Sequence, residues 1–370
     1  GRDRHRVAAV RTVGVEEELL LVDPAGGRAV SRAAGVLGTT PGSADPGVSQ
    51  EFTQQMVEIQ SRPHEGLDAL ERDLRSARER AASRAAEVGA AVAALATSPL
   101  PVDPVVMDTG RYRRIREEYG ALAREHLSCG CHVHVAVAGD EEGVAVLDRV
   151  RVWLPVLLAV SANSPFRHGE DTGYASYRWQ LMARWPVSGP PPAFGSAEGY
   201  RSRVRQLVGA GVIDEPAMVY FDARLAEGYP TVELRVADVC SRVEDTVLLA
   251  ALSRALVETA ARQWRQGHEA PQVDVDLLRL ATWRASRHGL EGDLLDPGTW
   301  QPHPAPRVVA ALLEHLGPAL RDAGDEVLAQ TGTDRVLRHG TGAALQREAY
   351  RRTRSLGDVV AEAVRTTSGG

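Results

Sequence analysis

The chain has 370 residues, of which 44% are hydrophobic and 25% charged, and this composition is ordinary for a globular protein. The formal net charge of −6 argues against a basic surface for nucleic acid. All 43 residues in the Lys+Arg total are arginines, which excludes a P-loop and a pyridoxal-phosphate site, since both need a lysine.

The cysteines and the apolar segments point to a reduced, cytoplasmic protein without a membrane partner. Cys129, Cys131 and Cys240 are odd in number and form no regular disulfide framework. No second thiolate pair follows at zinc-finger spacing. The most apolar run, 152–162, is too short to cross a bilayer, and the N-terminal arginines precede no signal-peptide segment.

Apolar spacing and turn residues predict three strands and two helices in the first 137 residues. In chain order they are strands at 13–22 and 55–60, helices at 67–96 and 112–127, and a strand at 131–137. The turn Asp23–Gly27 follows the first strand, and a loop rich in glycine, proline and serine at 35–49 precedes the second.

The remaining chain is predicted to be mainly helical. We expect a helix at 140–162 kinked at Pro155, an ordered functional loop at 163–192, a strand at 231–236, a helix at 244–264 and only helices over 272–365. The sum is an α+β protein with an antiparallel sheet and helices on one side. No boundary divides residues 1–370, so we expect a single catalytic domain, with a motif-bearing part at 10–265 and a C-terminal helical portion at 266–370.

Polar side chains recur at positions i and i+2 on three predicted strands. The pairs are Glu16 with Glu18, His132 with His134, and Glu233 with Arg235, and a fourth segment, 51–58, adds Glu51 and Glu58. For any one pair, a solvent-facing strand is the simpler interpretation. If the strands share one sheet face, however, the carboxylates converge and repel unless cations neutralise them.

Such a cluster indicates a divalent metal site. Oxygen-rich ligand sets with one imidazole suit Mg²⁺ or Mn²⁺ better than Zn²⁺. These ions commonly offset the charge of phosphates during phosphoryl transfer. The residues therefore predict a metal-dependent, nucleotide-using site on the concave face of a sheet.

Five ordered segments resemble the type 2 glutamate–cysteine ligase family of carboxylate–amine ligases. They are GVEEEL (14–19), CGCHVHV (129–135), LAVSANSPF (158–166), DTGYASYR (171–178) and PTVELRVAD (230–238). The resemblance implies a glutamine-synthetase-like fold, in which a curved antiparallel sheet holds ATP and Mg²⁺ and helices pack on its outer side. It also implies that ATP phosphorylates a carboxylate and that an amine then attacks the acyl phosphate.

The resemblance assigns roles position by position. It implies metal ligands at Glu16, Glu18, Glu51, Glu58, His132 and Glu233. Arg235 is expected to contact the transferring phosphoryl group, and Arg178 a phosphate or the substrate carboxylate. His134, Asn163, Thr172 and Ser176 are expected to line the substrate and nucleotide pocket. Glu17 is expected on the opposite face and Cys131 in the core.

One departure from the family pattern concerns the substrates. A histidine-containing stretch before the His-x-His strand is replaced here by Ala96-Thr97-Ser98-Pro99. Glutamate and cysteine are thus the default acid and amine, and another amine is left open. The expected partners are these small molecules, and a homo-oligomer is also left open.

Two other classes compete with the ligase interpretation. A zinc amidohydrolase also carries His-x-His on a strand, but needs further histidines and often a carbamylated lysine, which this chain lacks. A cupin-like binding protein needs a glutamate soon after His134, and Glu141 comes too late.

Overall fold

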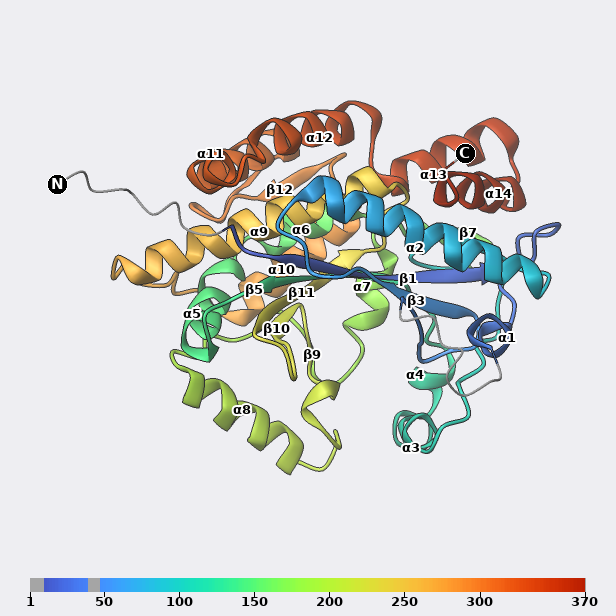
Figure 1. Ribbon diagram of the computed structural model, residues 1–370, viewed down its shortest axis with the longest axis horizontal. Helices are drawn as coiled ribbons and strands as arrows, with labels where there is room; N and C mark the ends of the chain where they lie inside the picture. Colours follow the sequence, from blue (N-terminus) through green and yellow to red (C-terminus); the bar gives the residue numbers. More distant parts are fainter. Residues whose placement is uncertain (1–9, 39–46, 370) are drawn as a thin grey trace.

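The computed structural model describes residues 10–38 and 47–369, and a seven-stranded sheet lies at its centre (Figure 1). The strands are β1 (Val13–Val22), β2 (Val48–Gln50), β3 (Met56–Gln60), β4 (Ala91–Ala93), β5 (Gly130–Ala136), β10 (Ala223–Leu225) and β11 (Thr231–Asp238). Their order is β10-β11-β5-β1-β3-β2, with β4 paired to β1, and every pairing is antiparallel. The predicted mixed fold with an antiparallel sheet is confirmed.

β1 lies in the interior of the sheet and is paired along both of its edges. β3 pairs with residues 16–20 on one edge, whereas β5 pairs with 13–17 and β4 with 20–22 on the other. Three consecutive glutamates favour a helix by intrinsic propensity. The backbone pairing on both edges overrides that preference, and the strand has the predicted bounds.

Helices cover one face of this sheet, drawn above it in Figure 1. They include α2 (Leu67–Glu87), α6 (Leu154–Ser161) and α9 (Val243–Arg265). Val13, Val15 and Val133 are buried in the same core cluster as these helices. The alternation of side chains along β1 and β5 therefore leaves the intervening residues on the opposite face.

A buried ion pair fastens β1 to the helices. Arg78 of α2 donates to both carboxylate oxygens of Glu17 at 2.8 and 2.7 Å, and the Thr246 hydroxyl of α9 donates to Glu17 at 2.5 Å. Glu17 and Arg78 are almost fully buried. Glu17 thus lies on the helix face, as expected, and its role is structural.

The predicted helix at 67–96 is wrong beyond residue 87. Gly89 has a φ of +71°, which ends the helical path, and Ala91–Ala93 form β4 against Leu20–Val22 of β1. The alanine-rich sequence favours a helix, but its residues complete the free edge of β1 instead.

Two further predicted helices are each divided. The 112–127 segment forms α3 (Gly110–Tyr119) and α4 (Ala121–Arg124), separated at Gly120 with a φ of +57°. The 140–162 segment forms α5 (Asp140–Val150) and α6, with Pro155 in the first turn of α6. Proline begins this second helix rather than kinking a single one.

The long loop at 163–192 contains short elements. They are β6 (Phe166–Arg167), β7 (Glu170–Asp171), α7 (Tyr177–Met182) and β8 (Ser188–Gly189). The next connection, also unpredicted, contains α8 (Ala197–Gly209), the 3-10 turn η1 (Pro216–Met218) and β9 (Tyr220–Phe221). Another short helix, α1 (Ala33–Leu37), follows β1.

The C-terminal portion is helical except for one hairpin. Its helices are α10 (Val275–His288), α11 (Ala305–Ala323), α12 (Glu326–His339), α13 (Gly342–Thr353) and α14 (Leu356–Thr367). The hairpin of β12 (Asp293–Leu295) and β13 (Pro302–Pro304) was not predicted. α11 and α12 pack on α9, and α14 packs on β4, so this portion adjoins the sheet-bearing part.

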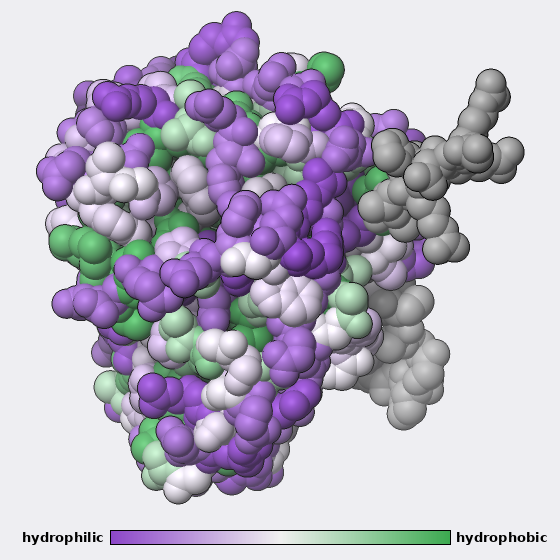
Figure 2. All heavy atoms as spheres, turned by 90° about the vertical axis from the view of Figure 1, so that its left-hand side faces the viewer, coloured by the Kyte–Doolittle hydropathy of each residue, from purple (hydrophilic) through white to green (hydrophobic). Residues whose placement is uncertain are grey.

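The side bearing the ends of α5, α8, α9 and α11 is mainly hydrophilic, with apolar side chains in small scattered groups (Figure 2). Among the residues described, none of the helices combines the length and apolarity needed to cross a bilayer.

Candidate active site

The strand register gathers the predicted polar residues on the sheet face away from α2 and α9. Directly opposite pairs are Glu16 with His132, Glu18 with Glu58, and Glu233 with His134. Because side chains alternate along each strand, all six lie on one face. Residues distant in the sequence thus form one cluster on β1, β3, β5 and β11.

Potential ligand atoms within this cluster form three overlapping groups. In each group the atoms lie within 4.8 Å of one another. The groups are Glu16–Glu58–His132, Glu16–His134–Glu233 and Glu18–Glu51–Glu58. Every residue predicted to bind metal belongs to at least one of them.

The end of the cluster near Glu18 is strongly acidic. Burial, followed by repulsion from Glu18 and Glu58, raises the pKa of Glu51 well above its usual range. Burial and the nearby Glu16 charge likewise raise the pKa of Glu58 to about 7, although Gln60 and Ser49 donate to its carboxylate. A cation among these oxygens removes the repulsion, so the donor set fits a hard divalent ion.

The other end combines Glu16 with two imidazoles. Nδ1 of His132 lies 3.4 Å and Nε2 of His134 3.5 Å from the Glu16 carboxylate. Nε2 of His134 is buried without a hydrogen bond to any described residue. Burial and the charge of Arg235 lower the pKa of His132, which favours the neutral imidazole that binds metals.

A bulge in β11 adds a guanidinium to the cluster. The register with β5 shifts between Leu234 and Ala237, and Arg235 at this bulge forms an ion pair with Glu233. Burial alone would raise the pKa of Glu233, but Arg235 and Arg224 lower it. Glu233 is therefore an anion at neutral pH.

An open cavity adjoins the imidazole end. It has a volume of about 490 Å³ and is lined by Gly14, Glu16, Pro63, His134, Tyr229 and Pro230, among others. Glu16 and His134 belong both to its wall and to the cluster. A small molecule held there would therefore touch the candidate metal ligands.

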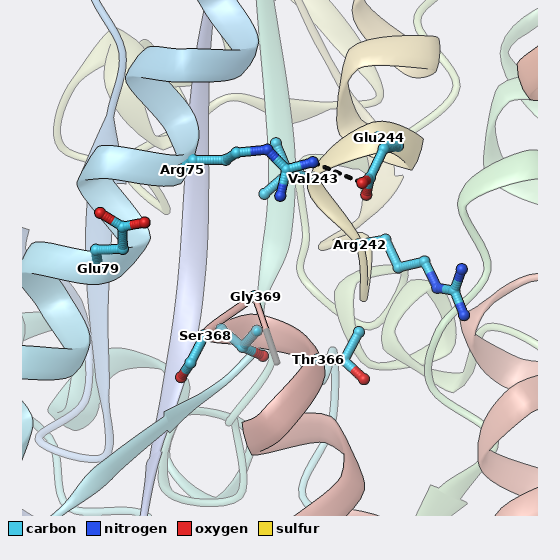
Figure 3. A pocket seen from close by; sticks show the side chains of 9 residues that line it. Arg75, Glu79, Arg242, Val243, Glu244, Thr366, Ser368 and Gly369 are labelled. Carbon is cyan, nitrogen blue, oxygen red and sulfur yellow. Dashed lines mark hydrogen bonds and ion pairs between the residues drawn. The ribbon is translucent and has the colours of Figure 1, made fainter.

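A second hollow lies among the helices and is unrelated to the cluster (Figure 3). Its volume is about 290 Å³, and it lies between α2, the start of α9 and the end of α14. Arg75 crosses it to reach Glu244 at 2.5 Å, and Glu79 and Arg242 lie on its wall. None of the residues predicted for the active site lines it.

Comparison with known proteins decides the family. The sequence model of the glutamate–cysteine ligase family 2 matches residues 12–366, nearly the whole chain. The chain belongs to this family. By family it is an ATP-dependent ligase, as the five sequence segments predicted.

Relatives of this ligase align over almost their full lengths. A Streptomyces coelicolor protein, provisionally named glutamate–cysteine ligase 2, is 52% identical over 360 residues, covering 97% of this chain and 99% of the relative. A provisionally named glutamate–cysteine ligase 2-1 from Paenarthrobacter aurescens is 49% identical over 366 residues, covering 97% and 95%.

Solved structures of other ligases share the fold. A glutamate–cysteine ligase from Francisella tularensis in complex with AMP has a TM-score of 0.73 at 13% identity, covering 98% of this chain and 89% of that chain. A bifunctional glutathione synthetase from Pasteurella multocida has a TM-score of 0.72 at 16% identity, covering 97% and 52%. At these identities the likeness concerns the fold alone.

Arg178 of the ligase lies beside the cluster rather than inside it. It is buried, and its guanidinium makes long hydrogen bonds of 3.3 and 3.4 Å to the carbonyls of Val236 and Arg235. Its Nε has no hydrogen-bond partner among the described residues. A side chain at Gly130 would overlap this guanidinium, and the Gly130 amide donates to Glu18. Contact of Arg178 with substrate stays a prediction.

The three predicted pocket residues of the 163–178 segment use their side chains for hydrogen bonds within the protein. Asn163 donates to the carbonyls of Ala94 and Val239, Thr172 to that of Pro165, and Ser176 to the Asp238 carboxylate. The structure does not bring these residues into the cluster of candidate metal ligands. They hold the segment in place, and any contact with substrate stays a prediction.

The 96–99 stretch follows β4 and lies beside the residue that precedes β5. The Cys129 amide donates to the Ala96 carbonyl at 2.9 Å, and the Thr97 hydroxyl donates to the Phe166 carbonyl at 2.8 Å. Cys131, as expected, is a buried core residue. No cysteine of the described residues belongs to a candidate metal group.

Sequence reasoning missed two charged residues beside the cluster. Arg224 of β10 donates to Glu233 at 2.7 Å, and Asp222 accepts the backbone amide of Arg235 at 2.8 Å. Burial raises the pKa of Asp222 to about 7. A three-residue strand shows too little alternation to be recognised, so only the pairing of β10 with β11 reveals Arg224, and Asp222 is the residue just before that strand.

Proposed function

We propose that the ligase joins a carboxylate to an amine through an acyl phosphate, giving an amide of the γ-glutamyl type. Its default substrates are ATP, glutamate and cysteine, with another amine left open. The observation that carries the proposal is the convergence of carboxylates, imidazoles and Arg235 on one sheet face. The relatives' names support the substrate class.

The cluster is proposed to bind Mg²⁺, or Mn²⁺, through Glu16, Glu18, Glu51, Glu58, His132 and Glu233. The raised pKa values of Glu51 and Glu58, together with the three groups of candidate ligand atoms that lie within 4.8 Å of one another, support a cation among these groups. When bound, such an ion supplies positive charge that offsets repulsion between the triphosphate and the substrate carboxylate.

The bond changes follow from the chemistry of a carboxylate. A carboxylate oxygen attacks the γ-phosphorus of ATP, and the bond to ADP breaks. The amine then attacks the acyl carbon, loses a proton, and phosphate leaves. The Arg235 guanidinium is proposed to neutralise the phosphoryl oxygens, and Arg178 is proposed to bind a phosphate or the substrate carboxylate.

The cavity at the imidazole end is proposed to receive the adenosine part of ATP. Pro63, Tyr229 and Pro230 give it apolar walls suited to a base, and the side chain of Tyr229 is largely exposed. His134 on its wall is proposed to hydrogen-bond to the bound substrate. The triphosphate would extend from this cavity toward Glu16 and Arg235.

The sheet is further proposed to be of the curved glutamine-synthetase type. One antiparallel sheet with helices on one face and the polar cluster on the other supports this assignment. A single catalytic domain is proposed because the C-terminal helices pack on α9 and β4. Cytoplasmic location and a homo-oligomer stay predictions.

Neither competing class gains support. The family is one of ligases, and the described cluster is dominated by carboxylates rather than by histidines. No observation favours a zinc hydrolase or a cupin-like binding protein.

ADP release in the presence of Mg²⁺, measured over pairs of amino acids and amines, tests the proposal. We expect release that needs both an acid and an amine, with glutamate and cysteine among the productive pairs. Glu58→Gln and Glu233→Gln should reduce release at least about tenfold, because each removes a charged ligand. Glu79→Gln, in the exposed hollow behind the sheet, is the control. Unchanged release in both cluster variants would contradict the metal assignment.

A further inference from the structure

Glu233 carries two guanidinium groups on one buried carboxylate. Nε of Arg224 donates to Oε2 at 2.7 Å, and Arg235 forms its ion pair with Oε1. The Glu233 side chain is only 3% exposed. A buried carboxylate needs one cation to be stable. Because Glu233 has two, the guanidinium groups of Arg224 and Arg235 can have different roles.

Arg224 is fixed by the protein on both sides of its guanidinium. Its Nη1 donates to the carbonyl oxygens of Ala217 and Val219 at 2.8 and 3.0 Å. These carbonyls belong to the η1 turn and to the residue just before β9. Because its Nε and Nη1 meet acceptors held by the fold, Arg224 cannot turn away without leaving carbonyls unpaired.

Arg235 is held much less tightly. Among the described residues, its guanidinium makes hydrogen bonds or ion pairs through Nη1 alone, to Glu233 and, at 3.4 Å, to Nδ1 of His132. Over residues 10–38 and 47–369, its Nε and Nη2 donate no hydrogen bond. Arg235 can therefore exchange Glu233 for another anion while its remaining donors stay available.

The two carboxylate oxygens of Glu233 also differ in what they face. Oε2 accepts from Nε of Arg224 at 2.7 Å, whereas Oε1 lies 3.8 Å from Nδ1 of His132 and makes only a long 3.5 Å contact with Nη2 of Arg224. Fixing Oε2 thus determines the direction of Oε1. Supporting hydrogen bonds of this kind orient metal ligands in many proteins.

We propose that Arg224 is a positioning residue that holds Glu233 with Oε1 toward the metal cluster, while Arg235 is the exchangeable partner that leaves Glu233 for the phosphoryl group. This inference rests on the proposed function, because it assumes a cation beside Oε1. Arg224 also keeps the Glu233 charge compensated when Arg235 moves away.

Mn²⁺ affinity measured by calorimetry without nucleotide tests this division of roles. Arg224→Met should weaken Mn²⁺ binding about tenfold or more, because Glu233 loses its fixed orientation. Arg235→Met, the matched variant on the other oxygen, should leave Mn²⁺ affinity unchanged or higher, because it removes a competing cation. In turnover, excess Mn²⁺ should restore much of the kcat of Arg224→Met and none of that of Arg235→Met.

Arg224→Lys shows whether a folding defect explains the result for Arg224→Met. The melting temperature of each variant is measured as well. The lysine keeps the charge but cannot reach Glu233 and both carbonyls together, so intermediate Mn²⁺ affinity is expected. Wild-type affinity in both Arg224 variants would overturn the inference and leave the proposed function intact. Absence of Mn²⁺ binding in the wild type would instead overturn the metal site itself.

Discussion

At the scale of single residues, the β11 bulge brings together a guanidinium that stays charged, that of Arg235, and a carboxyl whose pKa is raised, that of Asp222. Arg235 is a buried cation that interacts with Glu233, Glu18 and Glu16, and these charges outweigh burial and raise its pKa. The backbone carbonyl of Asp222 accepts a hydrogen bond from the Arg235 amide, and burial of the Asp222 side chain raises the pKa of its carboxyl to about 7. The first has the charge needed for phosphoryl transfer, and the second makes stability depend on pH.

Arg235→Ala is expected to reduce ADP release at least about a hundredfold, because it removes the guanidinium that is proposed to neutralise the transferring phosphoryl group. The melting temperature should fall by only a few degrees, since Arg224 still compensates Glu233. Both quantities are measured on the same preparation, with the exposed Arg242→Ala as the control. Severe unfolding together with residual activity would make Arg235 structural.

Asp222→Asn is expected to stabilise the ligase at neutral pH. Because burial raises its pKa from the ordinary value to about 7, the folded protein holds this proton more tightly than the unfolded chain. The corresponding stability is fully present below about pH 4 and is lost as pH rises through about 7. Asparagine keeps an oxygen for the Trp179 indole N–H, which donates to Asp222 at 3.2 Å.

Melting temperatures of the wild type and Asp222→Asn between pH 5 and 8 check this expectation. The difference in favour of the variant should grow as pH rises from 5 to about 7 and then level off. A constant difference would show that Asp222 does not titrate in the folded protein over that range.

At the scale of elements, the sequence predicts the strands in which polar and apolar side chains alternate. It misses the short strands that form only because a neighbouring strand pairs with them. β1, β5 and β11 carry i, i+2 patterns, so their bounds agree with prediction to within two residues. β4 and β10 have three residues each and exist because β1 and β11 have free edges. Glu16, Glu18, His132 and Glu233 were found for the same reason, whereas Arg224 lies on a short strand and was not.

At this scale, removing the buried Glu17–Arg78 ion pair between β1 and α2 tests most strongly what holds the sheet to the helices. Arg78→Ala should lower the free energy of unfolding by about 3–5 kcal/mol, because Glu17 keeps a buried charge without its cation. Arg75→Ala, one turn earlier on α2, removes the half-exposed pairs with Glu71 and Glu244 and should cost less than about 1 kcal/mol.

Denaturant unfolding of both α2 variants provides the measurement. Replacing Glu17 and Arg78 together by apolar residues should destabilise less than Arg78→Ala alone, since no unpaired charge remains. Equal effects of Arg78→Ala and Arg75→Ala would contradict a structural role for the buried pair.

At the scale of the whole molecule, the active site exists only in the folded chain. Its candidate ligands extend from Glu16 to Glu233, and four strands and the β2–β3 connection bring them within reach of one another. Local pattern predicted the pairs, but the strand order and the position of Glu51 follow from tertiary packing. A ligand that binds this cluster should therefore stabilise the whole fold.

The most direct test of the account is the melting temperature of the ligase as Mg²⁺ is added. A concentration one hundred times the dissociation constant adds about 2.7 kcal/mol of stability, so the wild type and the Glu79→Gln control should melt at progressively higher temperature. Glu58→Gln should show little or no rise over the same range. An equal rise in Glu58→Gln, or none in the wild type, would contradict a divalent cation among these carboxylates.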